Sequence, residues 1–124
     1  MRRNFFIFFL LAITSATVFA QADKADEYLQ AARKLRKEGK CAEALPLFKK
    51  AIEAKPTLAA AHYELGWCHN EMQQYEEALP VLEKALKLDP ANFRIIYESG
   101  FAQYKLGKTN EALVNFNRVL QMNT

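Results

Sequence analysis

Four side chains in the middle of the chain could carry metal or thiol chemistry: Cys41, Cys68, His62 and His69. Metal ligands on one element recur at spacings such as Cys-x-x-Cys or His-x-x-x-His, which bring two donors to the same face. The sequence contains neither spacing, and the adjacent Cys68 and His69 point about 100° apart on a helix. We therefore expect no metal site.

The sequence also lacks the residue combinations that catalysis and cofactor binding need. No serine or cysteine is accompanied by a recognisable base and orienting partner. The four glycines are isolated from one another, so no glycine-rich loop is available to hold a phosphate. We expect a protein that is not an enzyme and binds no cofactor.

The first twenty residues have the three-part build of a secretory signal peptide. A basic start is followed by an unbroken apolar run over 5–13 and by small residues before Ala20. A membrane-spanning helix is the alternative, but the 15 residues of 5–19 reach only about 22 Å, against a hydrocarbon core of about 30 Å. The sequence predicts cleavage after Ala20, with Ala22 as the alternative, and export to the periplasm or exterior without membrane insertion of the mature chain.

Length and charge bound the mature protein. At 124 residues the chain is long enough for one domain, and 51% hydrophobic residues argue against disorder. Loss of the arginines at positions 2 and 3 with the signal peptide lowers the formal net charge from +3 to +1. Nucleic-acid binding domains are strongly basic, so a nucleic-acid partner is not expected.

The rest of the chain repeats itself with a period of 34 residues. Residues of similar size occupy equivalent positions in three successive units. Two positions are small (Ala44, Ala78 and Ala112; Ala32, Gly66 and Gly100), and one is large and apolar (Phe48, Leu82 and Phe116). Self-similarity at periods of about 20–50 residues is typical of proteins built from stacked structural units.

Each unit is predicted to contain two helices. In the middle unit, apolar residues at helical spacing predict a first helix over 59–72 and a second over 76–88, which ends before Pro90. We expect Gly66 to face Ala78, because side chains this small let two helices pack closely.

The unit resembles the tetratricopeptide repeat, a pair of helices of 34 residues. Its signature residues stand in the middle unit at Leu65, Gly66, Tyr75, Ala78, Leu82, Ala85 and Pro90. The outer units depart at a few positions, with Ala32 for the first glycine and Cys41 and Thr109 for the turn aromatic. The resemblance implies an all-α protein, an alpha-solenoid of three repeats (25–58, 59–92 and 93–124) in a right-handed superhelix. This domain, 25–124, follows the signal peptide at 1–20.

By the same resemblance, the first helix of each pair lines a concave groove that binds a protein or peptide segment. The predicted groove residues are Arg33, Arg36, Lys37, Tyr63, Glu64, Trp67, Asn70, Arg94, Tyr97, Phe101 and Tyr104, and the same surface takes Leu29 and Glu98. Aromatic residues supply contact area at low entropy cost and are over-represented among binding hot spots. Packing of Trp67 or Tyr97 against a neighbouring helix is the alternative.

One ligand class of this family is disfavoured. Members that clamp the C-terminal carboxylate of heat-shock chaperones use a fixed set of Lys, Asn and Arg residues. The matching positions here are Leu29, Arg33, Glu64, Arg94 and Glu98, and only Arg94 has a suitable charge. Glu64 and Glu98 would repel a carboxylate.

Export would place Cys41 and Cys68 in an oxidising compartment. Cys41 lies in the turn of the first repeat and Cys68 in the first helix of the second, which stacks against it. A disulfide is one interpretation, and two separate small core residues are the other.

The last predicted helix leaves an apolar face without a neighbour, around Leu113, Phe116 and Leu120. Terminal repeats normally need a polar cap, and an exposed apolar face favours association. The sequence thus supports two functions: an exported adaptor that binds a protein segment in its groove, or a structural subunit that self-associates weakly through this face.

Overall fold

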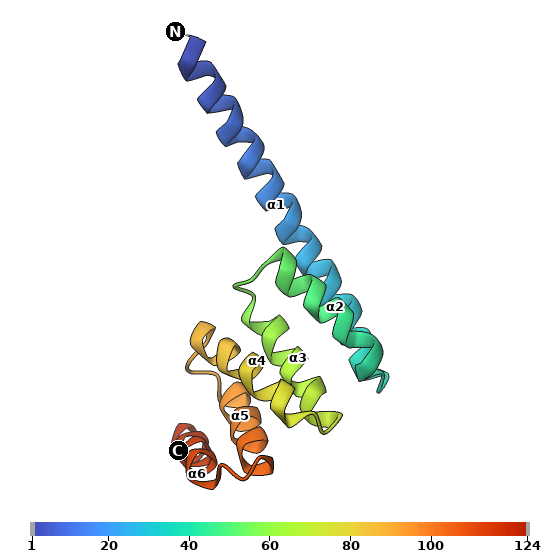
Figure 1. The fold of residues 1–124 in the computed structure, drawn as a ribbon, viewed down its shortest axis with the longest axis vertical. Coiled ribbons are helices and arrows are strands. Elements are labelled where there is room, and N and C mark those ends of the chain that lie inside the picture. Colours follow the sequence, from blue (N-terminus) through green and yellow to red (C-terminus); the bar gives the residue numbers. More distant parts are fainter. Residues whose placement is uncertain (1, 124) are drawn as a thin grey trace.

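A computed structural model describes the backbone of residues 2–123 and the side chains of residues 16–123. All regular structure in the described residues is helical (Figure 1). The helices are α1 (Arg2–Lys37), α2 (Cys41–Ala54), α3 (Ala59–Glu71), α4 (Tyr75–Leu88), α5 (Phe93–Lys105) and α6 (Thr109–Met122). The predicted all-α helical-repeat solenoid is confirmed, and both helices expected in the middle repeat begin and end within one residue of the prediction.

The turn inside each helix pair uses the same left-handed backbone conformation. Its φ angle is 76° at Gly39, 60° at Gln73 and 79° at Gly107, three positions that lie one repeat apart. Glycine adopts this conformation freely because it has no Cβ, whereas Gln73 adopts it at a cost. The 34-residue period of the sequence is therefore also a period of the backbone.

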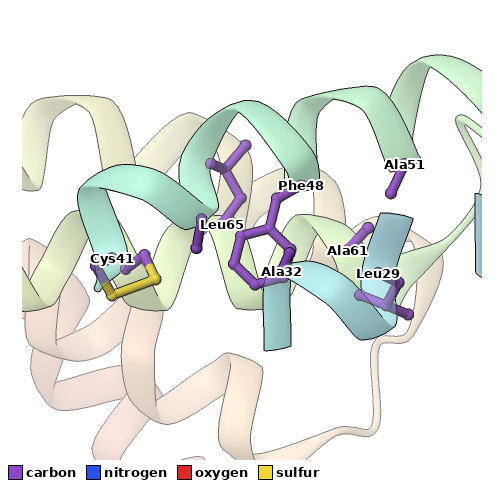
Figure 2. Packing of buried hydrophobic residues seen from close by; sticks show 9 residues of the cluster. Leu29, Ala32, Cys41, Phe48, Ala51, Ala61 and Leu65 are labelled. Atoms are coloured by element: carbon purple, nitrogen blue, oxygen red, sulfur yellow. A yellow bond between two sulfur atoms is a disulfide. The ribbon is translucent and has the colours of Figure 1, made fainter. Parts of the chain in front are cut away.

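Each helix packs against the next along the chain, and the first helices also contact one another, α1 with α3 and α3 with α5. The larger core cluster lies between the first two repeats and surrounds the Phe48 ring (Figure 2). Phe48 is fully buried, as is Leu82, which belongs to a second cluster between the last two repeats. Burial of such side chains stabilises the stack by about 1.5–3 kcal/mol each.

Gly66 permits the close approach of α3 and α4, but against a different residue from the expected one. A Cβ built at Gly66 would lie 2.5 Å from Cγ of Leu82, and Ala78 is not among its nearest neighbours. The equivalent Gly100 faces Phe116 and Asn115. The physical reason is that Leu82, one helical turn after Ala78, fills the space left by the absent side chain of Gly66.

Helix α1 is longer than the first helix of a repeat requires. Its 36 residues include the predicted signal peptide, and its first half projects away from the other helices (Figure 1). The side chains of 1–15, and with them most of the predicted signal peptide, lie outside the described residues. Within the part that is described, no helix combines the length and hydropathy needed to cross a bilayer.

Candidate protein-binding groove

Two adjoining hollows lie along α3 and α5, the first bounded also by α1 and the second by the end of α6. The first, of about 160 Å³, is lined by Arg33, Tyr63, Glu64, Asn92 and Arg94 among others. The second, of about 180 Å³, is lined by residues that include Tyr63, Phe93, Arg94, Tyr97 and Glu98. Because Tyr63 and Arg94 line both, the two hollows are neighbours, and we refer to them together as the groove.

Glu64 is the electrostatic centre of the first hollow. Its side chain is 6% exposed, and Arg33 Nε donates a hydrogen bond of 2.9 Å to its Oε1. Arg36 Nε lies 2.7 Å from the other carboxylate oxygen, and the Arg36 guanidinium stacks over the Trp67 ring at 4.9 Å. A buried carboxylate needs such partners to offset its lost hydration. These four predicted groove residues therefore bind one another, which fixes the wall of the groove.

The second hollow contains a carboxylate without a cationic partner. Asn70 Nδ2 donates to Oε2 of Glu98 at 2.9 Å and also to the Glu98 carbonyl at 3.1 Å. Burial raises the pKa of the Glu98 carboxyl, the hydrogen bond from Asn70 opposes this, and the nearby Glu71 raises it further. Burial likewise raises the pKa of the Tyr63 hydroxyl, with Glu98 as the next cause. Both groups favour their neutral forms more than exposed residues of their type do.

Arg94, Tyr97 and Phe93 are solvent-exposed members of the groove. The Tyr97 side chain is 48% exposed, although its ring tilts against Phe116 at 5.8 Å between centroids. The Arg94 guanidinium lies 5.8 Å from the centre of the Phe93 ring, and its backbone N–H donates to Oδ1 of Asn92. Asn92 is thereby the N-cap of α5 and holds its first turn against the hollow.

The structure brings five of the predicted groove residues into the lining of the hollows: Arg33, Tyr63, Glu64, Arg94 and Tyr97. The other six lie outside that lining: Arg36, Lys37, Trp67, Asn70, Phe101 and Tyr104.

Each of these six has a definable place. Asn70 is buried and Trp67 is half-buried beneath Arg36, while Lys37 and Tyr104 are exposed. The Phe101 ring packs edge-on against Tyr75 at 5.9 Å, and Lys105 covers it at 5.5 Å.

Two sequence expectations about the groove need correction. Leu29 was placed on the inner surface, but it is 3% exposed and belongs to the core cluster of the first two repeats (Figure 2). Sequence reasoning also missed Asn92 and Phe93. The signal for Asn92 is present in the sequence, because an asparagine two residues after Pro90 and just before a helical pattern is a typical N-cap.

The cysteines and histidines have structural contacts. Cys41 and Cys68 are joined by a disulfide that connects the start of α2 to α3, with Cα atoms 5.3 Å apart (Figure 2). His62 Nε2 donates a hydrogen bond to the Pro56 carbonyl at 2.9 Å. His69 Nδ1 donates one to Oε1 of Gln74 at 2.7 Å. Over the described residues, no group of His, Cys, Asp and Glu side chains could hold a metal ion.

The outward face of α6 differs from the equivalent face of α4. Leu113 is 53% exposed, whereas Leu79, at the same repeat position, is 6% exposed because α5 covers it. Leu120 and Val114 are also largely exposed.

These features define a class of protein: a helical-repeat solenoid with a side-chain groove on the face of its first helices. Family models of the tetratricopeptide repeat match residues 29–93 and 70–123. The chain belongs to the tetratricopeptide repeat family, whose fold typically serves as a protein-interaction module without catalytic chemistry.

Several solved structures are similar to this chain. The second TPR of Spaghetti (RPAP3), bound to the HSP90 peptide SRMEEVD, is 30% identical, with coverage of 83% of this chain and 97% of that chain and a TM-score of 0.79. MamA from Desulfovibrio magneticus RS-1 is 24% identical over 79% of this chain and 55% of its own, with a TM-score of 0.75.

The Yersinia enterocolitica type III secretion translocator chaperone SycD is 19% identical over 82% of this chain and 76% of its own, also with a TM-score of 0.75. MamA and SycD share the fold alone. A comparison with curated protein sequences finds no significant match.

Proposed function

We propose that the protein is an exported, non-catalytic adaptor that binds an extended segment of another protein along the groove. The observation that carries this proposal is the pair of neighbouring hollows that share Tyr63 and Arg94 in their lining. Together they offer a path with aromatic rings, a free guanidinium and a carboxylate along one face. Ligand sites of this kind combine apolar contact area with a few placed polar groups.

The groove is already organised before a partner arrives. Glu64 pairs with Arg33 and Arg36, and Asn70 holds Glu98, so binding would not have to order these side chains. A preorganised site loses less conformational entropy on association and binds more tightly for the same contacts.

The likeness to a peptide-bound repeat domain of RPAP3 supports a peptide segment as the ligand. The chaperone C-terminus itself is a poor candidate, because the half-buried Glu98, which has no ion pair in the described chain, lies at a position that the resemblance assigns to carboxylate binding.

Export rests on the signal-peptide pattern and is supported by the disulfide between Cys41 and Cys68. Disulfides persist in the periplasm and outside the cell and are rare in the reducing cytosol. Cell fractionation and mass spectrometry of the amino terminus test this part of the proposal. A chain that begins at Gln21, or after Ala22, supports it, and an intact chain in the cytosol contradicts it.

Site-specific photocrosslinking in the native host tests the adaptor role. A photoreactive amino acid replaces Tyr97 in the groove and, as a matched control, the exposed Lys84 on α4. We expect a discrete protein adduct from position 97 that is absent from position 84. Absence of an adduct at position 97, or identical adducts at both positions, would contradict the proposal.

Self-association through α6 is a second candidate, favoured by the contrast between Leu113 and Leu79. A leucine at this repeat position is covered by the next helix in the middle repeat and uncovered on α6. A second copy that pairs its α6 antiparallel to the first would bury both leucines in a two-fold symmetric contact. Sedimentation velocity at rising concentration tests it: dimers should form and should disappear in Leu113→Glu, and a monomer throughout contradicts it.

A further inference from the structure

Two opposite charges on α5 lie one helical turn apart and do not pair. Arg94 and Glu98 both line the second hollow, at the i and i+4 positions where Arg and Glu commonly form an ion pair. In the described chain, the ion pairs join Glu64 to two arginines and Lys40 to Glu38, and none joins Arg94 to Glu98.

Each of the two charges is held away from the other by a separate contact. Glu98 Oε2 accepts the hydrogen bond from Asn70 on α3, which turns the carboxylate toward the neighbouring repeat. The Arg94 guanidinium lies over the Phe93 ring at the start of α5. The second hollow is therefore lined by a cation and an anion, both without an ionic partner in the described chain.

The other charged side chains that line the two hollows are Arg33, Glu64 and Asp89, all of them in the first hollow, where Asp89 Oδ2 accepts a hydrogen bond from Asn92 Nδ2. Arg33 and Arg36 both pair with the buried Glu64. In the lining of the second hollow the charged side chains are Arg94 and Glu98, so electrostatic discrimination between partner segments there falls to these two residues.

The spacing of the two backbone positions that carry these charges matches an extended peptide. Residues four apart on a helix are separated by about 6 Å along its axis. Residues two apart in an extended chain lie about 6.6–6.8 Å apart and point to the same side. A segment that runs along α5 can therefore place one side chain on Arg94 and the next same-side one on Glu98, between the rings of Tyr63 and Tyr97.

We propose that the groove selects segments with an acidic and a basic residue two positions apart, the acidic side chain on Arg94 and the basic one on Glu98. This inference rests on the proposed adaptor function and specifies its ligand. The positive end of the α5 dipole lies beside Arg94, which further favours the acidic residue at that end.

A peptide array probed with the purified mature protein tests the proposal. Peptides of one composition carry Asp and Lys either two positions apart, adjacent, or four apart, in both orders. We expect binding about fivefold to tenfold stronger for the two-apart spacing in one of the two orders. Binding without any dependence on spacing overturns the inference and leaves the adaptor function intact, whereas the absence of binding to every peptide counts against both.

Exchange of the two charges provides a more specific test of the proposal than the peptide array alone. The double variant Arg94→Glu, Glu98→Arg exchanges the two charges at constant net charge and should invert the preferred order of Asp and Lys. The matched control, Glu83→Lys with Lys84→Glu, exchanges two exposed charges on α4 and should leave the order unchanged.

The variant Glu98→Gln guards against a merely structural effect, because glutamine can still accept the Asn70 hydrogen bond. It should abolish the preference for the basic residue and keep that for the acidic one. An unchanged order in the reversal variant, or an unchanged basic preference in Glu98→Gln, overturns the inference.

Discussion

Replacement of Gly66 by alanine tests whether the stack depends on the close contact between α3 and α4. The added Cβ would lie 2.5 Å from Cγ and 2.6 Å from Cδ2 of Leu82, a side chain with no exposed surface. Separations this short force a shift, and the surrounding core leaves the leucine little room to make one. Gly66→Ala should therefore destabilise the domain.

The expected loss follows from two opposing effects. Overpacking of a core costs about 1–3 kcal/mol, whereas alanine in a helix gains up to about 1 kcal/mol over glycine. Because Leu82 is fully buried, the cost lies at the upper end, and the net loss should be about 2 kcal/mol. A loss of that size lowers the melting temperature by about 8–16 °C in a domain of this length.

Gly100→Ala is the matched control. Its Cβ would meet Phe116 at 2.9 Å and Asn115 at 3.2 Å, and the half-buried phenylalanine ring can move toward solvent. We expect this variant to stay within about 1 kcal/mol of the parent.

Urea denaturation followed by circular dichroism measures both variants of this pair. In the double variant Gly66→Ala, Leu82→Ala, the new methyl group should occupy space freed by the leucine, so the two losses should not add. A Gly66→Ala protein as stable as the parent, or no more destabilised than Gly100→Ala, would refute the packing argument.

Four further outcomes are expected from denaturation experiments. Reduction of the Cys41–Cys68 disulfide, whose partners are 27 positions apart, should lower the free energy of unfolding by about 3–4 kcal/mol in the chain-entropy model. A variant with both cysteines changed to serine should not respond to reductant, and two free thiols in the exported protein would contradict the bridge. Glu64→Gln leaves two half-exposed guanidinium groups without their carboxylate and should lose about 1–3 kcal/mol, and unchanged stability would show that the pairs contribute nothing. Burial raises the pKa of Glu98 in the folded state, so its ionised form opposes folding at neutral pH, and this cost is lost as the pH falls through the folded-state pKa. Glu98→Gln should thus unfold at higher urea than the parent at neutral pH, with a difference that shrinks on acidification, and a pH-independent difference would argue against the assignment. Gln73→Gly should raise the free energy of unfolding by about 0.5–1 kcal/mol, because glycine adopts the left-handed turn without strain, and a loss of stability would show that the glutamine side chain matters more.

Much of the fold follows from the sequence because its period is unusually clear. The helix bounds of the middle repeat and the burial of Phe48 and Leu82 come directly from apolar spacing. The partner of Gly66 could not be found in this way, because spacing shows which residues face inward but not which one fills a gap between crossing helices. That choice depends on the crossing geometry and on the conformation of Leu82.

The groove was less accessible to sequence reasoning. The mutual binding of Arg33, Arg36 and Glu64 links residues about one repeat apart, and no local pattern indicates that the carboxylate between the arginines is buried. A position on a first helix does not by itself place a residue in the groove, as Leu29 shows. Its side chain is instead enclosed by the core of the first two repeats.

The uncovered Leu113 also says something about how such an array can grow. Leu79 on α4 packs against α5, and Leu113 occupies the same repeat position on α6 but is exposed. If one 34-residue segment were duplicated in frame, the first helix of the added repeat could pack against Leu113 as α5 packs against Leu79. Such an insertion would lengthen the ligand path by one unit without remodelling the older ones. The length of the binding surface could therefore be changed by duplication of a repeat, without substitutions in the existing ones.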